Sequence, residues 1–128
     1  MTGALRLALL AAVAPLVFAA GTAGAADALP CRPEGQQQAM DDCAVRSFRD
    51  ADAKLNIRYV AVMEALPADK RMALRTDQRE WIRQRDPHCK VQARPSEGGP
   101  TWSQVFYKCL ERASADRLEA INGWESRK

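Results

Sequence analysis

Histidine is almost absent from this chain, and its few cysteines are widely spaced. The only histidine is His88, and none of the four cysteines belongs to the C-x-x-C pair that is typical of a zinc site. The sequence also lacks a G-x-S-x-G nucleophile motif and a phosphate-binding loop. These absences argue against a metal site, a cofactor and a catalytic nucleophile. We therefore expect a protein that is not an enzyme.

Neither sign of charge dominates the sequence. The 19 lysine and arginine residues stand against 16 acidic residues, so the formal net charge is only +3. Domains that bind nucleic acid usually concentrate a larger positive charge on one face. We therefore expect no nucleic-acid partner.

The longest apolar run stands at the N-terminus and is typical of a signal peptide. Residues 5–20 are almost entirely apolar, and Arg6 gives the segment a weakly positive start. Ala23 and Ala25 supply the small residues that a cleavage site requires. The run is too short and too rich in alanine for a transmembrane span.

Two other interpretations of this segment fit less well. A retained amphipathic anchor would need a polar face, and a lipoprotein would need small residues where Pro30 precedes Cys31. We predict a cleaved signal peptide at residues 1–25 and a single mature domain at residues 26–128. The mature protein would then be periplasmic or secreted.

Three amphipathic helices are predicted in the mature part. Apolar residues recur every three or four positions in residues 37–66, three apolar residues share one helix face in residues 68–89, and a third stripe begins at residue 102. The composition of residues 92–100 indicates a loop. Thr101 and Gln104 have the spacing of a capping box at the start of the third helix. The stripes comprise Ala44, Phe48, Ala51, Leu55, Tyr59, Val62 and Leu66, then Leu74, Trp81 and Cys89, then Trp102, Phe106, Cys109, Ala113, Ala120 and Trp124.

Two prolines are expected to interrupt the predicted helices. Pro67 ends the first helix or opens the second, and the short turn makes these helices antiparallel neighbours. Pro87 should disturb the last turn of the second helix. The predicted fold class is all-α, a small antiparallel three-helix bundle that two disulfides stabilise.

The cysteines all lie in the part predicted to be exported. An even number of cysteines in a small exported domain indicates disulfides. The bundle brings Cys43, Cys89 and Cys109 to one end, with Cys31 on the arm before it, and any of three pairings could be built there. We favour Cys31–Cys43 and Cys89–Cys109, because each bridge then ties an arm or a loop to its adjoining helix. Each could contribute roughly 3 kcal/mol.

Polar residues interrupt the apolar face of the second helix. Gln78 and Arg85 fall in the middle of that face, and a buried arginine must be paired. We predict an internal network that fixes the register of the helices. Its members are Asp52, Asn56, Tyr59, Gln78 and Arg85, with Arg117 at the edge of the third helix.

A basic ridge runs along the same helix. Its members recur at every fourth position and are Arg71, Arg75, Arg79 and Arg83. The ridge is either a solvated face moderated by Asp77 and Glu80, or a surface that docks an anionic partner such as lipid headgroups or acidic glycan.

The spacing of these motifs resembles the LprI-type lysozyme-inhibitor domain, also described as domain of unknown function 1311. The resemblance covers about residues 31–121. It rests on Cys31 before Gln38-Ala39-Met40-Asp41-Asp42-Cys43, then Asp52-Ala53-Lys54-Leu55-Asn56 and Tyr59, then Leu74, then Gln78-Arg79-Glu80-Trp81-Ile82-Arg83-Gln84-Arg85-Asp86 with Cys89, and then Gly98-Gly99, Cys109-Leu110 and Arg117.

The resemblance implies a helical, disulfide-stabilised envelope domain and supports pairing the cysteines first with second and third with fourth. It also implies contact with a lysozyme or another envelope protein. Because lysozymes are usually basic, the basic ridge would repel one, and the contact would use Asp41, Asp42 and Asp50 or the loop with Glu97, Gly98 and Gly99. The alternative is a structural or adaptor protein whose ridge binds an anionic surface. The oligomeric state is not predicted.

Overall fold

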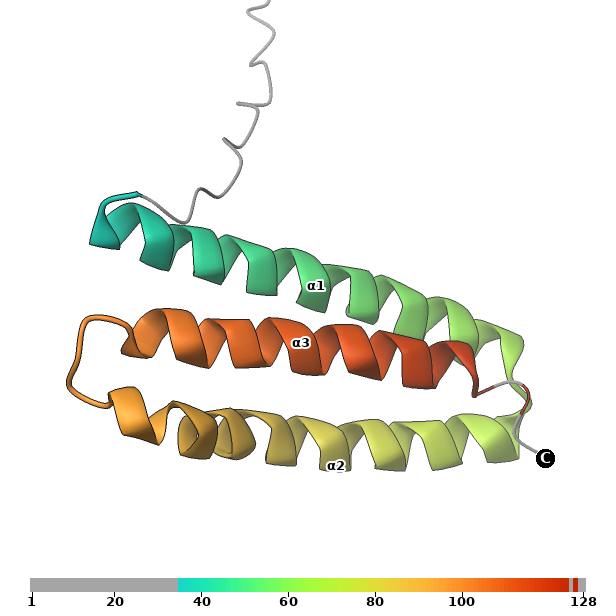
Figure 1. Ribbon diagram of the computed structural model, residues 1–128. Coiled ribbons are helices and arrows are strands. Elements are labelled where there is room, and N and C mark those ends of the chain that lie inside the picture. Colours follow the sequence, from blue (N-terminus) through green and yellow to red (C-terminus); the bar gives the residue numbers. More distant parts are fainter. Residues whose placement is uncertain (1–34, 125, 127–128) are drawn as a thin grey trace, which may run out of the picture.

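The computed structural model describes residues 35–124 and residue 126, and within them the chain is helical with no strand. Three long helices, α1 (Gln37–Ala65), α2 (Ala68–Ala93) and α3 (Trp102–Asn122), are joined by a sharp turn and by a longer loop that contains the 3₁₀ helix η1 (Arg94–Ser96). Helices α1 and α3 run in the same direction and α2 runs against both (Figure 1). The predicted all-α fold with three helices is confirmed. The predicted signal peptide lies outside the described residues and stays a prediction.

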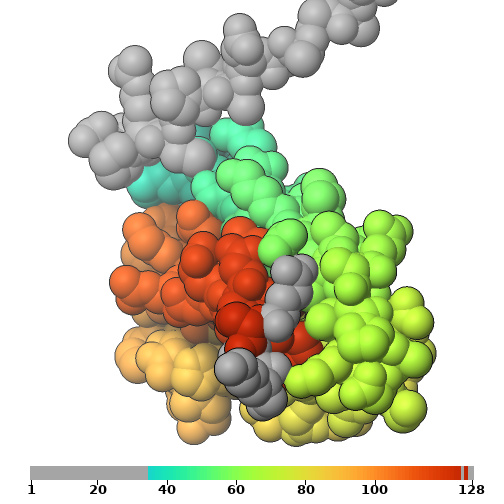
Figure 2. Space-filling view, turned by 90° about the vertical axis from the view of Figure 1, so that its right-hand side faces the viewer, coloured from blue at the N-terminus to red at the C-terminus, as the bar shows by residue number. Residues whose placement is uncertain are grey.

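The turn between α1 and α2 forms because two consecutive residues leave the helical conformation. Leu66 and Pro67 are both extended, with ψ of 148° and 162°, and Pro67 is the N-cap of α2. The Leu66 side chain is buried in the core, which fixes the turn against the bundle. The predicted boundary of the first two helices at Pro67 is therefore confirmed. Figure 2 views this end of the bundle, where α1, α2 and α3 meet.

Helix α2 extends beyond the predicted end at Cys89. It passes through Pro87 and ends at Ala93. The loop therefore begins two residues later than the predicted start at residue 92. Proline removes one backbone hydrogen bond and usually kinks or ends a helix. Here Cys89 and Ala93 are both fully buried against Phe106 and Leu110 of α3. This burial favours continuation of the helix past the proline.

The predicted capping box at the start of α3 is wrong. Thr101 is the N-cap residue, but its ψ of −4° is helical and its side chain makes no capping hydrogen bond. A capping side chain normally requires an extended N-cap residue. The Gln104 side chain instead donates from Nε2 to Oδ1 of Asp41 on α1, at 3.3 Å. Gln104 therefore joins the first turns of α1 and α3.

The apolar core forms two clusters along the bundle. At the Pro67 end the buried residues are Leu55, Val62, Leu66, Leu74 and Ile121, with Tyr59, Met63, Trp81, Leu118 and Trp124 packed around them. At the other end they are Cys89, Ala93, Phe106 and Leu110, with Phe48, Trp102, Tyr107 and Cys109 beside them. Each cluster contains residues from more than one helix, so the stripes predicted from the sequence do face inward.

A disulfide links the end of α2 to α3. Cys89 and Cys109 are bonded, with their Cα atoms 5.5 Å apart, as predicted. Cys43 is buried and is not a free thiol. Its predicted partner Cys31 lies outside the described residues, so that second bridge stays a prediction.

Removing the Cys89–Cys109 disulfide should destabilise the protein, because the unfolded chain is then no longer restricted by the closed loop. The bond closes 20 residues of chain, so a Cys89→Ala, Cys109→Ala double variant should lose roughly 3 kcal/mol in the free energy of unfolding. Urea denaturation followed by circular dichroism measures this. A loss below about 1 kcal/mol would show that the loop is held by packing alone.

Candidate functional site

A buried arginine lies between the two core clusters. Arg85 of α2 donates from Nη1 to Oδ1 of Asp52 on α1 at 2.7 Å, and from Nε to Oδ1 of Asp86 at 2.8 Å. Its guanidinium lies 5.2 Å from the ring centroids of both Phe48 and Trp81. Only 12% of this side chain is exposed. Its charge is therefore balanced by two carboxylates and two aromatic faces.

Asp52 connects this arginine to all three helices. Its Oδ1 also accepts a hydrogen bond from the hydroxyl of Ser114 on α3 at 3.5 Å, and its Oδ2 accepts one from Asn56 at 3.3 Å. Ser114 is fully buried. A shift of any helix along its axis would break at least one of these bonds.

A second buried arginine joins α3 to α2. Arg117 donates from Nε to Oε1 of Gln78 at 2.7 Å and from Nη2 to Oδ2 of Asp77 at 2.5 Å. Its guanidinium lies 5.6 Å from the Trp81 ring, whose centroid is also within 5.2 Å of Arg85. Only 10% of the Arg117 side chain is exposed, and Gln78 is 5% exposed. Trp81 therefore contacts both buried arginines.

The sequence did not indicate every member of this arrangement. Asp77 directly precedes Gln78, and Asp86 directly follows Arg85. Helical spacing does not indicate that a residue next to a network member also pairs with a buried arginine. Ser114 carried no signal, because a single serine in an apolar stripe is common. Tyr59, predicted for the network, packs against the Pro67-end cluster instead.

The internal arrangement offers structural rather than chemical capability. No buried side-chain nitrogen or oxygen in the described part of the chain is left without a hydrogen-bond partner. Residues 35–124 and 126 also contain no group of three or more side chains able to hold a metal ion. The polar groups inside the described part of the bundle are thus paired with one another.

The basic ridge is exposed along its whole length. The side chains of Arg71, Arg75 and Arg79 are exposed, and Arg83, itself 71% exposed, pairs with Glu80. The hydrogen bond from Arg83 is the main reason that the pKa of Glu80 lies below its usual value, and a neighbouring glutamine adds a second hydrogen bond. The ridge therefore includes one arginine neutralised by a carboxylate and three that face solvent.

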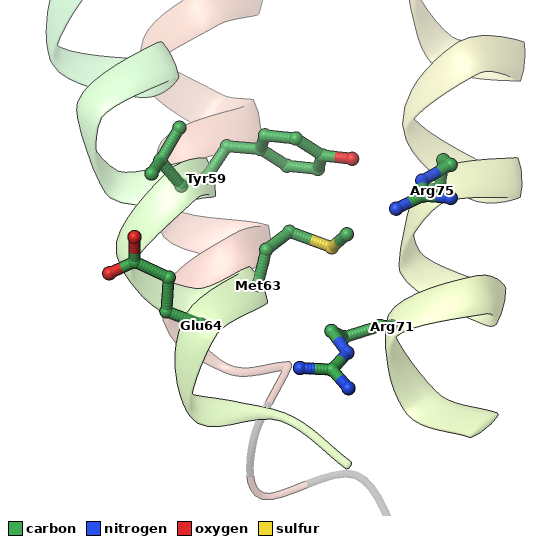
Figure 3. A pocket seen from close by; sticks show the side chains of 6 residues that line it. Tyr59, Met63, Glu64, Arg71 and Arg75 are labelled. Carbon is green, nitrogen blue, oxygen red and sulfur yellow. The ribbon is translucent and has the colours of Figure 1, made fainter. Parts of the chain in front are cut away.

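A groove separates α1 from α2 near the Pro67 turn. Its volume is about 490 Å³, and it is lined by Tyr59, Val60, Met63, Glu64, Arg71 and Arg75. Figure 3 shows Tyr59 and Met63 extending from α1 toward Arg75 and Arg71 on α2, while Glu64 points away. The groove thus combines an apolar wall with the first half of the basic ridge.

The loop that carries Glu97, Gly98 and Gly99 lies at the opposite end. All three residues are exposed, and Gly98 has a φ of +76°, which favours glycine. The backbone N–H of Gly99 donates to the carbonyl of Ser96, and the loop is anchored by the nearby disulfide. The Gln37 side chain also donates to the carbonyl of Pro100. The loop is therefore tied to both α2 and α1.

The acidic residues predicted for partner binding are in different settings. Asp41 accepts hydrogen bonds from Gln37 and Gln104 and is partly buried, so it belongs to the joint between α1 and α3. Asp42 is exposed beside it, whereas Asp50 is exposed about two turns farther along α1. Asp42 and Glu97 are thus the accessible carboxylates at the disulfide end among these four.

These features define a class of protein: a disulfide-bridged, all-helical domain whose internal polar groups are paired with one another. The family model for lysozyme inhibitor LprI matches residues 31–121. The chain belongs to this family, as its motifs had indicated.

One curated relative extends this comparison. An uncharacterized protein of Rhizobium meliloti (strain 1021) is 30% identical over 104 residues, which cover 71% of this chain and 75% of the relative. No solved structure matches the chain significantly. Within the described residues, no helix is both long and apolar enough to cross a membrane.

The pairing of Arg85 with Asp52 should matter more for stability than a pair on the ridge. We expect Asp52→Asn to lower the free energy of unfolding by about 1–2 kcal/mol, because it removes the charge that faces a largely buried guanidinium. The matched control is Glu80→Gln, which disrupts the exposed pair with Arg83 and should change stability by less than about 0.5 kcal/mol. Chemical denaturation measures both, and equal effects would contradict this assignment.

Proposed function

We propose that this protein is an exported, non-catalytic binding protein that inhibits a lysozyme by direct contact. The single observation that carries this proposal is the match to the lysozyme inhibitor LprI family, which spans α1, α2 and nearly all of α3. The internal pairing of the polar residues supports a binding role, because it leaves the exposed surfaces as the interacting parts.

Export is part of this proposal. Lysozymes act on the cell wall, so an inhibitor must be outside the cytoplasm. The N-terminal apolar run has the form of a cleavable signal peptide. The Cys89–Cys109 bond supports the same location, since stable disulfides form in oxidising compartments.

The loop at the disulfide end is the surface we propose for contact. A basic enzyme would be repelled by the ridge on α2 and attracted by the exposed carboxylates of Glu97 and Asp42. The loop is held by the disulfide and by hydrogen bonds from both sides. A restrained loop loses little conformational entropy when it enters a cleft, which favours affinity.

A second candidate function is docking to an anionic envelope surface through the basic ridge. The exposed side chains of Arg71, Arg75 and Arg79 favour it, because three cations on one helix attract acidic headgroups or glycans. In this case the protein would be a structural or adaptor component rather than an inhibitor.

Reversal of the Glu97 charge should weaken inhibition. We expect the oxidised mature protein to inhibit at least one of several lysozymes, and Glu97→Lys to raise the inhibition constant about tenfold, because a rim carboxylate becomes a like charge. The measurement is the rate of cell-wall lysis against inhibitor concentration.

Glu119→Lys is the matched control for this experiment. It makes the same change in net charge at an exposed site near the other end of the bundle, so its inhibition constant should stay within about twofold of the parent. Absence of inhibition at micromolar excess would contradict the inhibitor function. Salt-sensitive binding to anionic vesicles without inhibition would favour the second candidate.

A further inference from the structure

The groove between α1 and α2 has the size of a small-molecule site. Its volume of about 490 Å³ falls in the range of roughly 300–1,000 Å³ that is typical of such sites. It is also short, because the residues that line α1 run only from Tyr59 to Glu64 and thus span about 7.5 Å of the helix axis. An amphipathic helix normally needs contacts over several turns. These dimensions favour a small ligand over a macromolecule.

The chemistry of the lining specifies an amphiphile. One wall is formed by residues of α1, which are Tyr59, Val60 and Met63, and the opposite wall by Arg71 and Arg75 of α2. Figure 3 shows the Tyr59 ring and the Met63 side chain extending toward the two arginines. Within the described part of the chain neither arginine forms a salt bridge, and the Glu64 carboxylate points out of the groove (Figure 3). An occupant that satisfies both walls has an apolar body and an anionic group.

The N-terminal segment of this chain is too short to reach the groove. Residue 35 is at the far end of α1, about 36 Å from Tyr59. Residues 26–34, which remain after the predicted cleavage, reach at most about 32 Å when fully extended.

A second copy of the chain is also a poor occupant. A symmetric dimer places the same patch of both subunits in contact. Four guanidinium groups would then meet in one interface, which leaves that interface with excess positive charge. The occupant must therefore supply its own negative charge.

We propose that this groove binds a fatty acid. The carboxylate lies between Arg71 and Arg75, which stand one turn apart on α2 and offer the forked donors that suit a carboxylate. The acyl chain covers Met63 and Val60, and the Tyr59 hydroxyl, which points toward Arg75, adds a donor near the carboxylate. This site lies at the opposite end from the Glu97 loop, so it is independent of the proposed lysozyme contact.

Isothermal titration calorimetry with dodecanoate below its micellar concentration tests this site on the oxidised mature protein. Arg71→Gln, Arg75→Gln should weaken binding about tenfold, because it removes both guanidinium groups of the groove. The matched control is Arg79→Gln, Arg83→Gln, which removes the same charge from the ridge outside the groove and should change the affinity by less than about twofold. Glu97→Lys should leave dodecanoate binding unchanged, whatever its effect on lysozyme.

Four results would overturn the proposal. They are absence of dodecanoate binding, equal loss in the two double variants, equal affinity for the uncharged dodecanol, and tighter binding of a dipeptide with a C-terminal leucine carboxylate. Sedimentation equilibrium provides a further check. A dimer that Arg71→Gln, Arg75→Gln dissociates would assign the groove to a second copy of the chain instead.

Discussion

The pairing of Arg85 with Asp52 is the interaction on which the arrangement of the helices depends. A largely buried guanidinium is tolerated only when its hydrogen-bond donors and its charge are matched. Asp52 provides that match from α1 and is itself bonded to Ser114 of α3, so the three helices have one common register. Because Phe48 packs in one core cluster and Trp81 in the other, the arginine lies where the two clusters meet. The apolar stripes alone would allow the helices to slide. The ion pair selects one position, which is a contribution to specificity more than to stability.

This register determines which surfaces the protein can present. The disulfide and the joint of Gln37, Asp41 and Gln104 secure one end of the bundle. The extended residues Leu66 and Pro67 secure the other. Between them the core consists of two clusters of apolar side chains that pack against one another. Two surface features result: a tethered loop at the disulfide end, and a groove between α1 and α2 near Pro67.

The sequence predicted the features that depend on local rules. Helical periodicity placed α1, the Pro67 turn and the inward stripes, and the cost of a buried arginine pointed from Arg85 to Asp52. It failed where tertiary packing outweighed local preference. Helix α2 continues to Ala93 instead of ending at Cys89 as predicted, because Cys89 and Ala93 are buried against α3. Gln104 bonds to another helix rather than capping its own. The groove was not predictable, since its shape depends on the separation of two helices, which a single sequence does not contain. The regular spacing of four arginines predicted the ridge. It did not predict that Arg71 and Arg75 line the groove while Arg79 and Arg83 lie outside it.

The separation of the two surfaces has an electrostatic consequence. Helix α1 has 29 residues and is about 43 Å long, so the loop and the groove lie several Debye lengths apart at physiological ionic strength. A basic enzyme at the Glu97 loop would therefore be screened from Arg71 and Arg75, the two ridge arginines that line the groove. These two arginines would oppose such a contact if they lay beside the loop, but they would not oppose it at this distance. The overall charge of the chain, which is slightly positive, is thus a poor guide to its partners. With this distribution of charge along the bundle, the proposed contact with a cationic protein and the proposed binding of an anionic ligand would not oppose each other.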